Sequence, residues 1–228
     1  KFNIGIPSLT KDGTKMYFTI CHDKNDKDVC NIYLSVFIGS DWAKPVRINN
    51  INSIDASSKH PYVFIDSKSK SEYLIYSSNA VGGMGEFDLY YAYIENDGSV
   101  SEPINMGEKV NSADDELTLL YDSASAYLYF ISSRHIGVTD LDVFKVKANI
   151  SKGFVKPENI GHLLNFSEKD YYFVSLDSSD NKNTYGFTGQ QSKKILNEIP
   201  KDEILIVEKS ENIKKNIVDN KNSDTIPL

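Results

Sequence analysis

Tyr73-Leu74-Ile75-Tyr76-Ser77-Ser78 and Tyr127-Leu128-Tyr129-Phe130-Ile131-Ser132-Ser133 are two copies of one pattern, and this repetition decides the fold. Each copy follows an apolar stretch and a polar turn that carries Asp, at 61–66 and 117–122. A third copy covers 7–19, and a weaker fourth covers 171–188. Equivalent aromatic positions recur at intervals of 54 to 58 residues, at Phe18, Tyr76, Phe130 and Phe187. A period of this size, built from short strands and turns, predicts propeller blades rather than helical solenoids.

The second half of each repeat adds a glycine-rich loop, a strand that opens with Asp, and an outer strand that contains Pro. Pro suits an edge strand because it cannot donate to the hydrogen-bond ladder. We therefore expect an all-β propeller of four-stranded antiparallel blades over residues 1–210, with a polar tail at 211–228. The expected blades are approximately 1–52, 53–110, 111–163 and 164–210. The positions that we expect to shape the repeat are Asp12, Gly13, Gly83, Gly85, Asp88, Gly137, Asp140 and Asp142.

The number of blades stays open at this point. Four may be all that this chain shows of a larger ring, because propellers carry about four to eight blades. An open arc would expose edge strands, which tend to pair with other chains. Pairing of residues 1–6 with residues 203–208 would distinguish a closed ring from an open arc.

Composition excludes several classes of function. The 228 residues carry a formal net charge of −7, which disfavours binding to a nucleic-acid backbone. No apolar run approaches the roughly 20 residues that span a bilayer, so we expect no transmembrane segment in this chain. No signal peptide opens the sequence, which we interpret as a mature chain or a piece of a longer one.

Two cysteines, Cys21 and Cys30, flank a polar loop between two expected strands. Antiparallel strands bring such flanking residues together, so a disulfide is sterically feasible and would indicate an oxidising compartment. Two free thiols that pack as small apolar side chains are the alternative. The sequence leaves both possibilities open.

The repeat resembles that of TolB-like β-propellers. The resemblance rests on the Pro-to-Phe pattern at 7–18, the glycine-rich loop, and the Ser-Glu-Pro-Ile-Asn-Met-Gly stretch at 101–107. This longer form is similar to the propeller of PorE-like periplasmic OmpA-family lipoproteins of Bacteroidota, which belong to the type IX secretion and gliding machinery. The resemblance covers roughly residues 1–190 and implies a periplasmic, outer-membrane-associated module. No residues match the peptidoglycan-binding domain of that family, so peptidoglycan would be reached only through a missing neighbouring domain.

Metal and nucleophile chemistry have little support in the sequence. The histidines, His22, His60, His135 and His162, fall in different repeats without the paired spacing of a metal site. The loop from Asp23 to Asp28 is rich in oxygen ligands but lacks the central Gly and closing Glu of a calcium-binding EF-hand loop. No Gly-x-Ser-x-Gly motif and no phosphate-binding loop occur. We expect no cofactor, no metal and no catalytic residues.

Carboxylates and aromatics support an alternative function. Asp114-Asp115-Glu116 form an acidic cluster, and paired carboxylates at a propeller mouth can hydrolyse glycosides. Trp42 and Tyr91 could stack on a sugar or a peptide if exposed. The recurrence of Asp88, Asp140 and Asp142 favours turn or strand caps over catalysis.

We therefore expect a non-catalytic propeller that binds a protein partner of an envelope or secretion assembly, as a scaffold. The alternative is a glycan-binding or glycan-active propeller that uses loop carboxylates and aromatics. A third, weaker possibility is a propeller that filters substrates for a missing peptidase domain.

Overall fold

The computed structural model describes residues 2–5, 7–24, 27–66, 69–122, 126–133, 142–148, 150, 153–159, 173–176 and 184–187. The chain divides into two compact units, residues 1–168 and 169–228, which we treat separately. All regular elements in the described ranges are strands: β1 (Phe2–Ile4), β2 (Ser8–Leu9), β3 (Lys15–Lys24), β4 (Lys27–Ile38), β5 (Asp41–Trp42), β6 (Val46–Arg47), β7 (Ser58–Ile65), β8 (Glu72–Ser78), β9 (Asp88–Tyr93), β10 (Ile104–Asn105), β11 (Glu116–Asp122), β12 (Tyr127–Ser132), β13 (Asp142–Lys147), β14 (Glu158–Asn159), β15 (Phe173–Leu176) and β16 (Thr184–Phe187).

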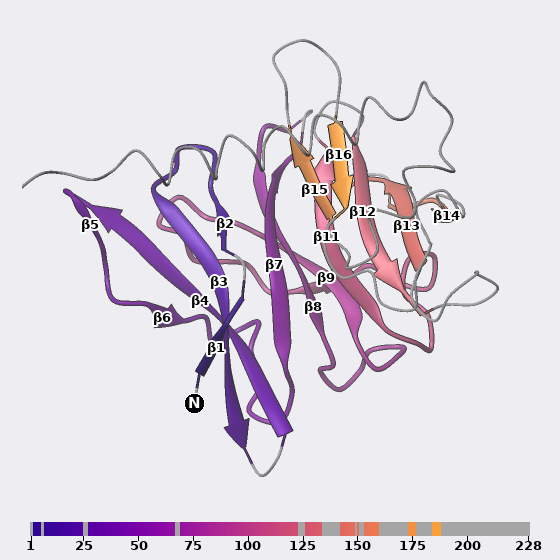
Figure 1. The fold of residues 1–228 in the computed structure, drawn as a ribbon, viewed down its shortest axis with the longest axis horizontal. Coiled ribbons are helices and arrows are strands. Elements are labelled where there is room, and N and C mark those ends of the chain that lie inside the picture. The colour runs from indigo at the N-terminus through magenta and orange to yellow at the C-terminus, as the bar shows by residue number, and fades with distance from the viewer. Residues whose placement is uncertain are drawn as a thin grey trace, which may run out of the picture. The chain divides into compact units, whose positions relative to one another are not determined.

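The first unit contains three antiparallel sheets, and each sheet is one propeller blade (Figure 1). Blade 2 has the order β7-β8-β9-β10, and blade 3 has the order β11-β12-β13-β14. Blade 1 is built around the β3–β4 hairpin, with β1 and β2 on the β3 side and β5 and β6 on the β4 side. The second unit contributes the described hairpin β15–β16. The predicted all-β propeller of antiparallel blades is confirmed, with four strands in blades 2 and 3 and six in the sheet of blade 1.

Two apolar cores lie between successive blades. The first interblade core joins blade 1 to blade 2 and the second joins blade 2 to blade 3. Strand β8 contributes to both, because side chains alternate between the two faces of a strand. Leu74 and Tyr76 enter the first core and Ile75 enters the second, and all three are buried. The aromatic-rich pattern of the repeat therefore reflects a strand with an apolar neighbour on each face.

The first strands of neighbouring blades lie next to one another, since β7 contacts β2 of blade 1 and β11 of blade 3. Strand β7 is the edge of its sheet, and it also contacts β3 of blade 1. We call these first strands the inner strands. The end of the blades at which β7 and β11 begin is called the inner end below.

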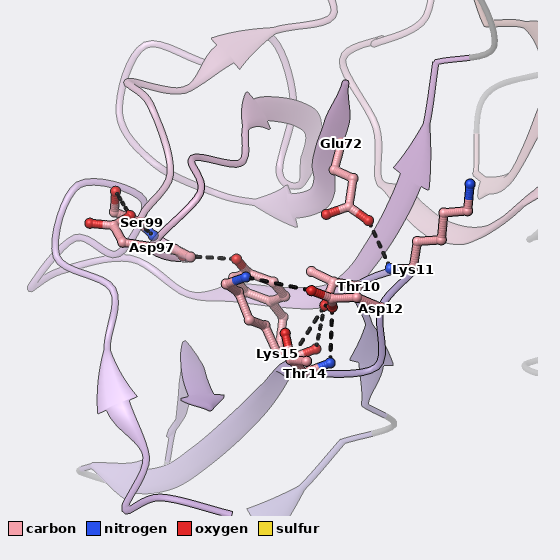
Figure 2. A network of polar contacts seen from close by, with 10 residues as sticks. Thr10, Lys11, Asp12, Thr14, Lys15, Glu72, Asp97 and Ser99 are labelled. Carbon is pink, nitrogen blue, oxygen red and sulfur yellow. Dashed lines mark hydrogen bonds and ion pairs between the residues drawn. The ribbon is translucent and has the colours of Figure 1, made fainter. Parts of the chain in front are cut away.

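A polar network fastens blade 1 to blade 2 at the opposite end of the strands (Figure 2). The Thr10 hydroxyl and the Thr14 backbone N–H both donate to Asp12 Oδ1, at 2.6 and 2.9 Å. The Lys11 N–H donates across the blades to Glu72 Oε1 at 2.7 Å. Gly13, with φ of +69°, completes this turn in a backbone region that favours glycine.

Several predicted features lie outside the described residues. They are most of the fourth blade, the tail at 211–228, the 203–208 segment, Gly137, Asp140, His135 and His162. The described ranges contain no helix with the length and apolar character that a bilayer crossing requires.

Candidate functional site

Cys21 and Cys30 face each other in the register of β3 and β4 and form a disulfide. The bond closes the part of this hairpin that extends beyond the blade. Strand β1 pairs with the same part, since Asn3 lies opposite Cys21. The disulfide-closed hairpin is therefore tied to the start of the chain.

The glycine-rich loop between β8 and β9 is held by Asp88. Its carboxylate accepts the Met84 N–H at 2.6 Å, the Gly85 N–H at 3.0 Å and the Asn105 side-chain amide at 2.7 Å. In blade 3, Asp142 accepts the Asn159 side-chain amide at 3.0 Å. Both carboxylates are buried, and their described partners belong to the same blade. Asp88 therefore connects the third strand of blade 2 to its loop and to its outer strand, and Asp142 connects the third strand of blade 3 to its outer strand.

Glu116 occupies the first position of β11 and is completely buried. Its carboxylate accepts the Ser112 N–H at 2.9 Å, the Ser112 hydroxyl at 2.6 Å and the Ser132 hydroxyl at 2.8 Å. Burial raises the pKa of Glu116 against the effect of these hydrogen bonds, and the Asp88 carboxylate adds to the rise. A carboxylate without exposed surface cannot touch a ligand, so the role of Glu116 is to hold the linker before β11.

The neighbouring carboxylate, Asp115, is different. Its side chain is partly exposed, and its Oδ1 is buried without a hydrogen-bond partner. A buried acceptor without a donor is costly, because it has lost its water without replacement. The Asp115 backbone is fixed, since its N–H donates to the Ser133 hydroxyl at 3.0 Å. The Asp115 side chain therefore projects from a fixed backbone position at the inner end.

Lys59, near the start of β7, lies close enough to Asp115 for the carboxylate to influence its pKa. Burial lowers the pKa of Lys59, and the Asp115 carboxylate acts in the opposite direction. The Lys59 ammonium sits 3.6 Å from the centre of the Phe87 ring, a cation–π arrangement. The Phe87 carbonyl in turn accepts the Glu116 N–H at 2.6 Å. The start of β7, the residue before β9 and the start of β11 therefore lie close together around the Lys59 ammonium.

His60 is held in an unusual backbone conformation beside Lys59. Its φ is +54°, a region that residues other than glycine rarely adopt, and the register of β7 shifts between Lys59 and Tyr62. Such bulges redirect side chains and are frequent near active sites. Desolvation, with a smaller contribution from the Lys59 ammonium, lowers the pKa of His60 to about 4, although its side chain keeps an exposed surface. At neutral pH the imidazole is therefore uncharged.

We call Lys59, His60, Phe87 and Asp115 the inner-end site. It offers a cation, a neutral imidazole and an unsatisfied carboxylate oxygen on two neighbouring blades. The sequence drew attention to Asp115 and His60 but not to Lys59 or Phe87. The available signal was the Lys59-His60-Pro61 stretch, where Pro interrupts an inner strand and favours a bulge.

Other predicted candidates lie elsewhere. Trp42 is 40% exposed and packs edge-to-face on Phe37 in the β4–β5 hairpin. Tyr91 lines a cleft of about 320 Å³ together with Phe154, along β10. Among the described residues, no three His, Cys, Asp or Glu side chains are gathered as metal ligands. The loop from Asp23 to Asp28 contains residues outside the described ranges.

No protein-family model matches the chain. No curated protein sequence matches it either. Solved structures do match. An endo-arabinase from Bacteroides thetaiotaomicron VPI-5482 gives a TM-score of 0.52 at 11% identity, over 81% of this chain and 70% of the enzyme. An α-L-arabinofuranosidase from Clostridium thermocellum ATCC 27405 gives 0.51 at 15% identity, over 82% of this chain and 62% of the enzyme.

A third match is an α-L-arabinofuranosidase from Podospora anserina, with a TM-score of 0.49 and 13% identity, over 81% of this chain. This chain spans 63% of that enzyme and 62% of the Clostridium enzyme, less than two thirds of either. At these identities, the two matches with TM-scores above 0.5 show a common fold.

These neighbours correct the family resemblance. The expected TolB-like, PorE-like propeller is contradicted, because the fold matches glycoside hydrolases. The physical reason lies in the residues that carried the resemblance. Asp12, Gly13, Gly85 and Asp88 shape turns and loops within blades, and such turns are needed by any propeller. The repeat therefore predicts the structure of a propeller blade, but it does not distinguish one propeller family from another.

Two functional expectations change with it. The non-catalytic scaffold of a type IX secretion or OmpA-family assembly is contradicted by the same neighbours, and so is the expectation that the chain is not an enzyme. Both depended on the family resemblance and on the lack of a recognisable catalytic motif. A constellation assembled from separate blades leaves no such motif, because its residues are far apart in the sequence.

Proposed function

We propose that this propeller is glycan-active and that its glycan binds at the inner-end site. Two observations support the proposal: the fold matches an endo-arabinase and an α-L-arabinofuranosidase, and the inner-end site combines groups that suit a sugar. Sugar hydroxyls both donate and accept hydrogen bonds, and the site offers both kinds of partner.

The observation that carries the proposal is the Asp115 carboxylate, whose side chain is partly exposed near Lys59. The exposed part of an ionised carboxylate accepts a charge-assisted hydrogen bond when a hydroxyl arrives.

Glycoside hydrolysis ordinarily uses two carboxyl groups, one as a general acid and one as a base or nucleophile. Of the inner-end carboxyl groups Asp88, Asp115 and Glu116, Asp115 is the one with exposed surface. Asp88 and Glu116 are close by but are engaged by three hydrogen bonds each. We assign Asp115 the contact with the substrate, and Asp88 and Glu116 the support of the surrounding loops.

The test is release of sugar by the full chain. The protein is incubated with branched arabinan and with a panel of other plant and bacterial glycans, and reducing ends are measured. We expect release from at least one glycan. Asp115→Asn keeps the size of the side chain but removes its charge, and we expect it to lower the rate by about 10²-fold or more.

Asp41→Asn is the matched control, because Asp41 is exposed on β5 in the β4–β5 hairpin. It should leave the rate unchanged. Release that is unaffected by Asp115→Asn would remove the inner-end site from the proposal. If the protein neither binds any glycan nor releases sugar from one, the glycan-active function itself is overturned.

We also propose that the chain works in an oxidising compartment, as the expected periplasmic location requires. The Cys21–Cys30 bond supports this, since disulfides persist mainly in such compartments. Alkylation of the protein taken from its native cells, before and after reduction, tests the proposal. Two thiols reactive before reduction would contradict it.

A further inference from the structure

Lys59 is a cation without an anion. Among the described residues it has no ion pair within 4.0 Å, although Asp115 is near enough to affect its pKa. The side chain is partly buried, so its ammonium has lost some of its water. A partly desolvated charge gains most from a directly bound counter-charge. A ligand anion in direct contact would therefore supply the counter-charge that Lys59 lacks among the described residues.

Phe87 fixes where this cation lies. The ring centre is 3.6 Å from Nζ, so one side of the ammonium faces the aromatic ring. A lysine ammonium carries three N–H donors, and the Phe87 ring contacts only the side of the ammonium that faces it. The remaining donors are available to a ligand. Because the cation is already positioned, less side-chain entropy is lost when a ligand binds.

The two charged groups suit different partners. Lys59 suits an anion, and the partly exposed Asp115 carboxylate suits a hydrogen-bond donor. A neutral sugar provides donors but leaves Lys59 without a counter-charge. A uronic acid carries a carboxylate and hydroxyls on one ring, so it can meet both needs. His60, uncharged at neutral pH, can exchange a further hydrogen bond with a hydroxyl.

We infer that the inner-end site selects an acidic glycan, with Lys59 binding the sugar carboxylate and Asp115 accepting a sugar hydroxyl. This inference rests on the proposed glycan-active function and names its substrate class. It assigns Lys59 the discrimination between acidic and neutral sugars. The acidic glycan and the protein, with its net charge of −7, are both negatively charged. Binding therefore depends on the local positive charge of Lys59.

The test is isothermal titration of the full chain with three probes: trigalacturonate, a neutral arabinotriose and a short poly-glutamate peptide. We expect trigalacturonate to bind roughly tenfold or more tightly than arabinotriose, the effect of one charge-assisted contact. Lys59→Met keeps the length of the side chain and removes the charge. We expect it to abolish this difference, with trigalacturonate binding weakened roughly tenfold or more and arabinotriose binding weakened much less.

Lys109→Met is the matched control, because Lys109 is an exposed lysine beside β10. It should leave both affinities unchanged. Near-ultraviolet circular dichroism of each variant checks that the fold is retained. A second variant, Asp115→Asn, should weaken both sugars, since both use its oxygen.

The failures are distinguishable. Equal binding of acidic and neutral trisaccharides, or an acidic preference that survives Lys59→Met, overturns the inference and leaves the glycan-active function intact. Lys59-dependent binding of poly-glutamate that exceeds that of trigalacturonate overturns the sugar class. The absence of binding or cleavage with every glycan overturns the proposed function together with the inference.

Discussion

Asn52 and Asn111 lie one blade apart and make the same pair of hydrogen bonds. Asn52 Oδ1 accepts the Ile32 N–H at 2.8 Å, and its amide donates to the Ile32 carbonyl at 2.8 Å. Asn111 does the same with Leu89, at 2.8 and 3.0 Å. Both side chains are buried. Each linker between blades is thus anchored to the third strand of the blade that it leaves.

The first prediction concerns this anchor. Asn111→Ala removes the acceptor of the Leu89 N–H, while the Leu89 carbonyl keeps the Met106 N–H as a donor. A buried N–H without a partner costs about 1–3 kcal/mol, so we expect the free energy of unfolding in urea to fall by about 2 kcal/mol. Asn50→Ala, at an exposed side chain that also bonds backbone carbonyls, should cost less than half of that. Equal losses would refute the role of the buried anchor.

The second prediction concerns the glycine-rich loop. A Cβ on Gly85 would overlap the Asp114 carbonyl and lie 2.7 Å from the Ser112 carbonyl, both of them backbone atoms. Gly85→Ala must therefore displace the linker before β11. Overpacking of this kind costs about 1–3 kcal/mol. At Gly5 the nearest atom is the Thr19 Cβ at 3.2 Å, so Gly5→Ala should be milder. The midpoints of thermal unfolding of both variants test this difference. A Gly85→Ala variant as stable as the parent would contradict the close approach of Gly85 to the linker before β11.

The third prediction concerns the disulfide. Replacing Cys21 and Cys30 by Ala releases a loop with a sequence separation of 9, and the loss of this constraint corresponds to roughly 2–3 kcal/mol. We expect the urea midpoint to fall and amide exchange in β1 to accelerate, because β1 pairs with the disulfide-closed part of β3. A reductant should shift the parent to the same midpoint and leave the double variant unchanged. A reductant effect on the variant would point to another cause.

The fourth prediction concerns acid stability. Hydrogen bonds from the Thr10 hydroxyl and then from Thr14 lower the pKa of Asp12 from its ordinary value of 3.8 to about 2. Because the folded-state pKa is the lower one, the contribution of Asp12 to stability is present above pH 4 and is lost as pH falls toward 2. Asp12→Asn should therefore flatten the dependence of the unfolding midpoint on pH between 4 and 2. A variant with the slope of the parent would show that Asp12 does not contribute in this window.

The fold could be predicted because the strands of one blade are consecutive in the sequence. The four strands of blade 2 lie within residues 58–105, so alternation, turn residues and an edge proline are all visible in one stretch of chain. The sequence also indicated that Cys21 and Cys30 could meet, since a hairpin aligns the residues that flank its turn. It could not identify the family, because Asp88 and Gly85 serve the blade whatever the propeller does.

The sequence by itself determined the repeat, the strand-rich blades and the small set of polar residues that recur in them. Only the tertiary structure decided the inner-end site. Lys59 and Asp115 are separated by a whole blade in the sequence, and they meet because the inner strands β7 and β11 pack side by side. The bulge at His60 and the unsatisfied oxygen of Asp115 likewise depend on neighbouring blades. Periodicity records the contacts within a blade, whereas a site between blades depends on packing that has no period in the sequence.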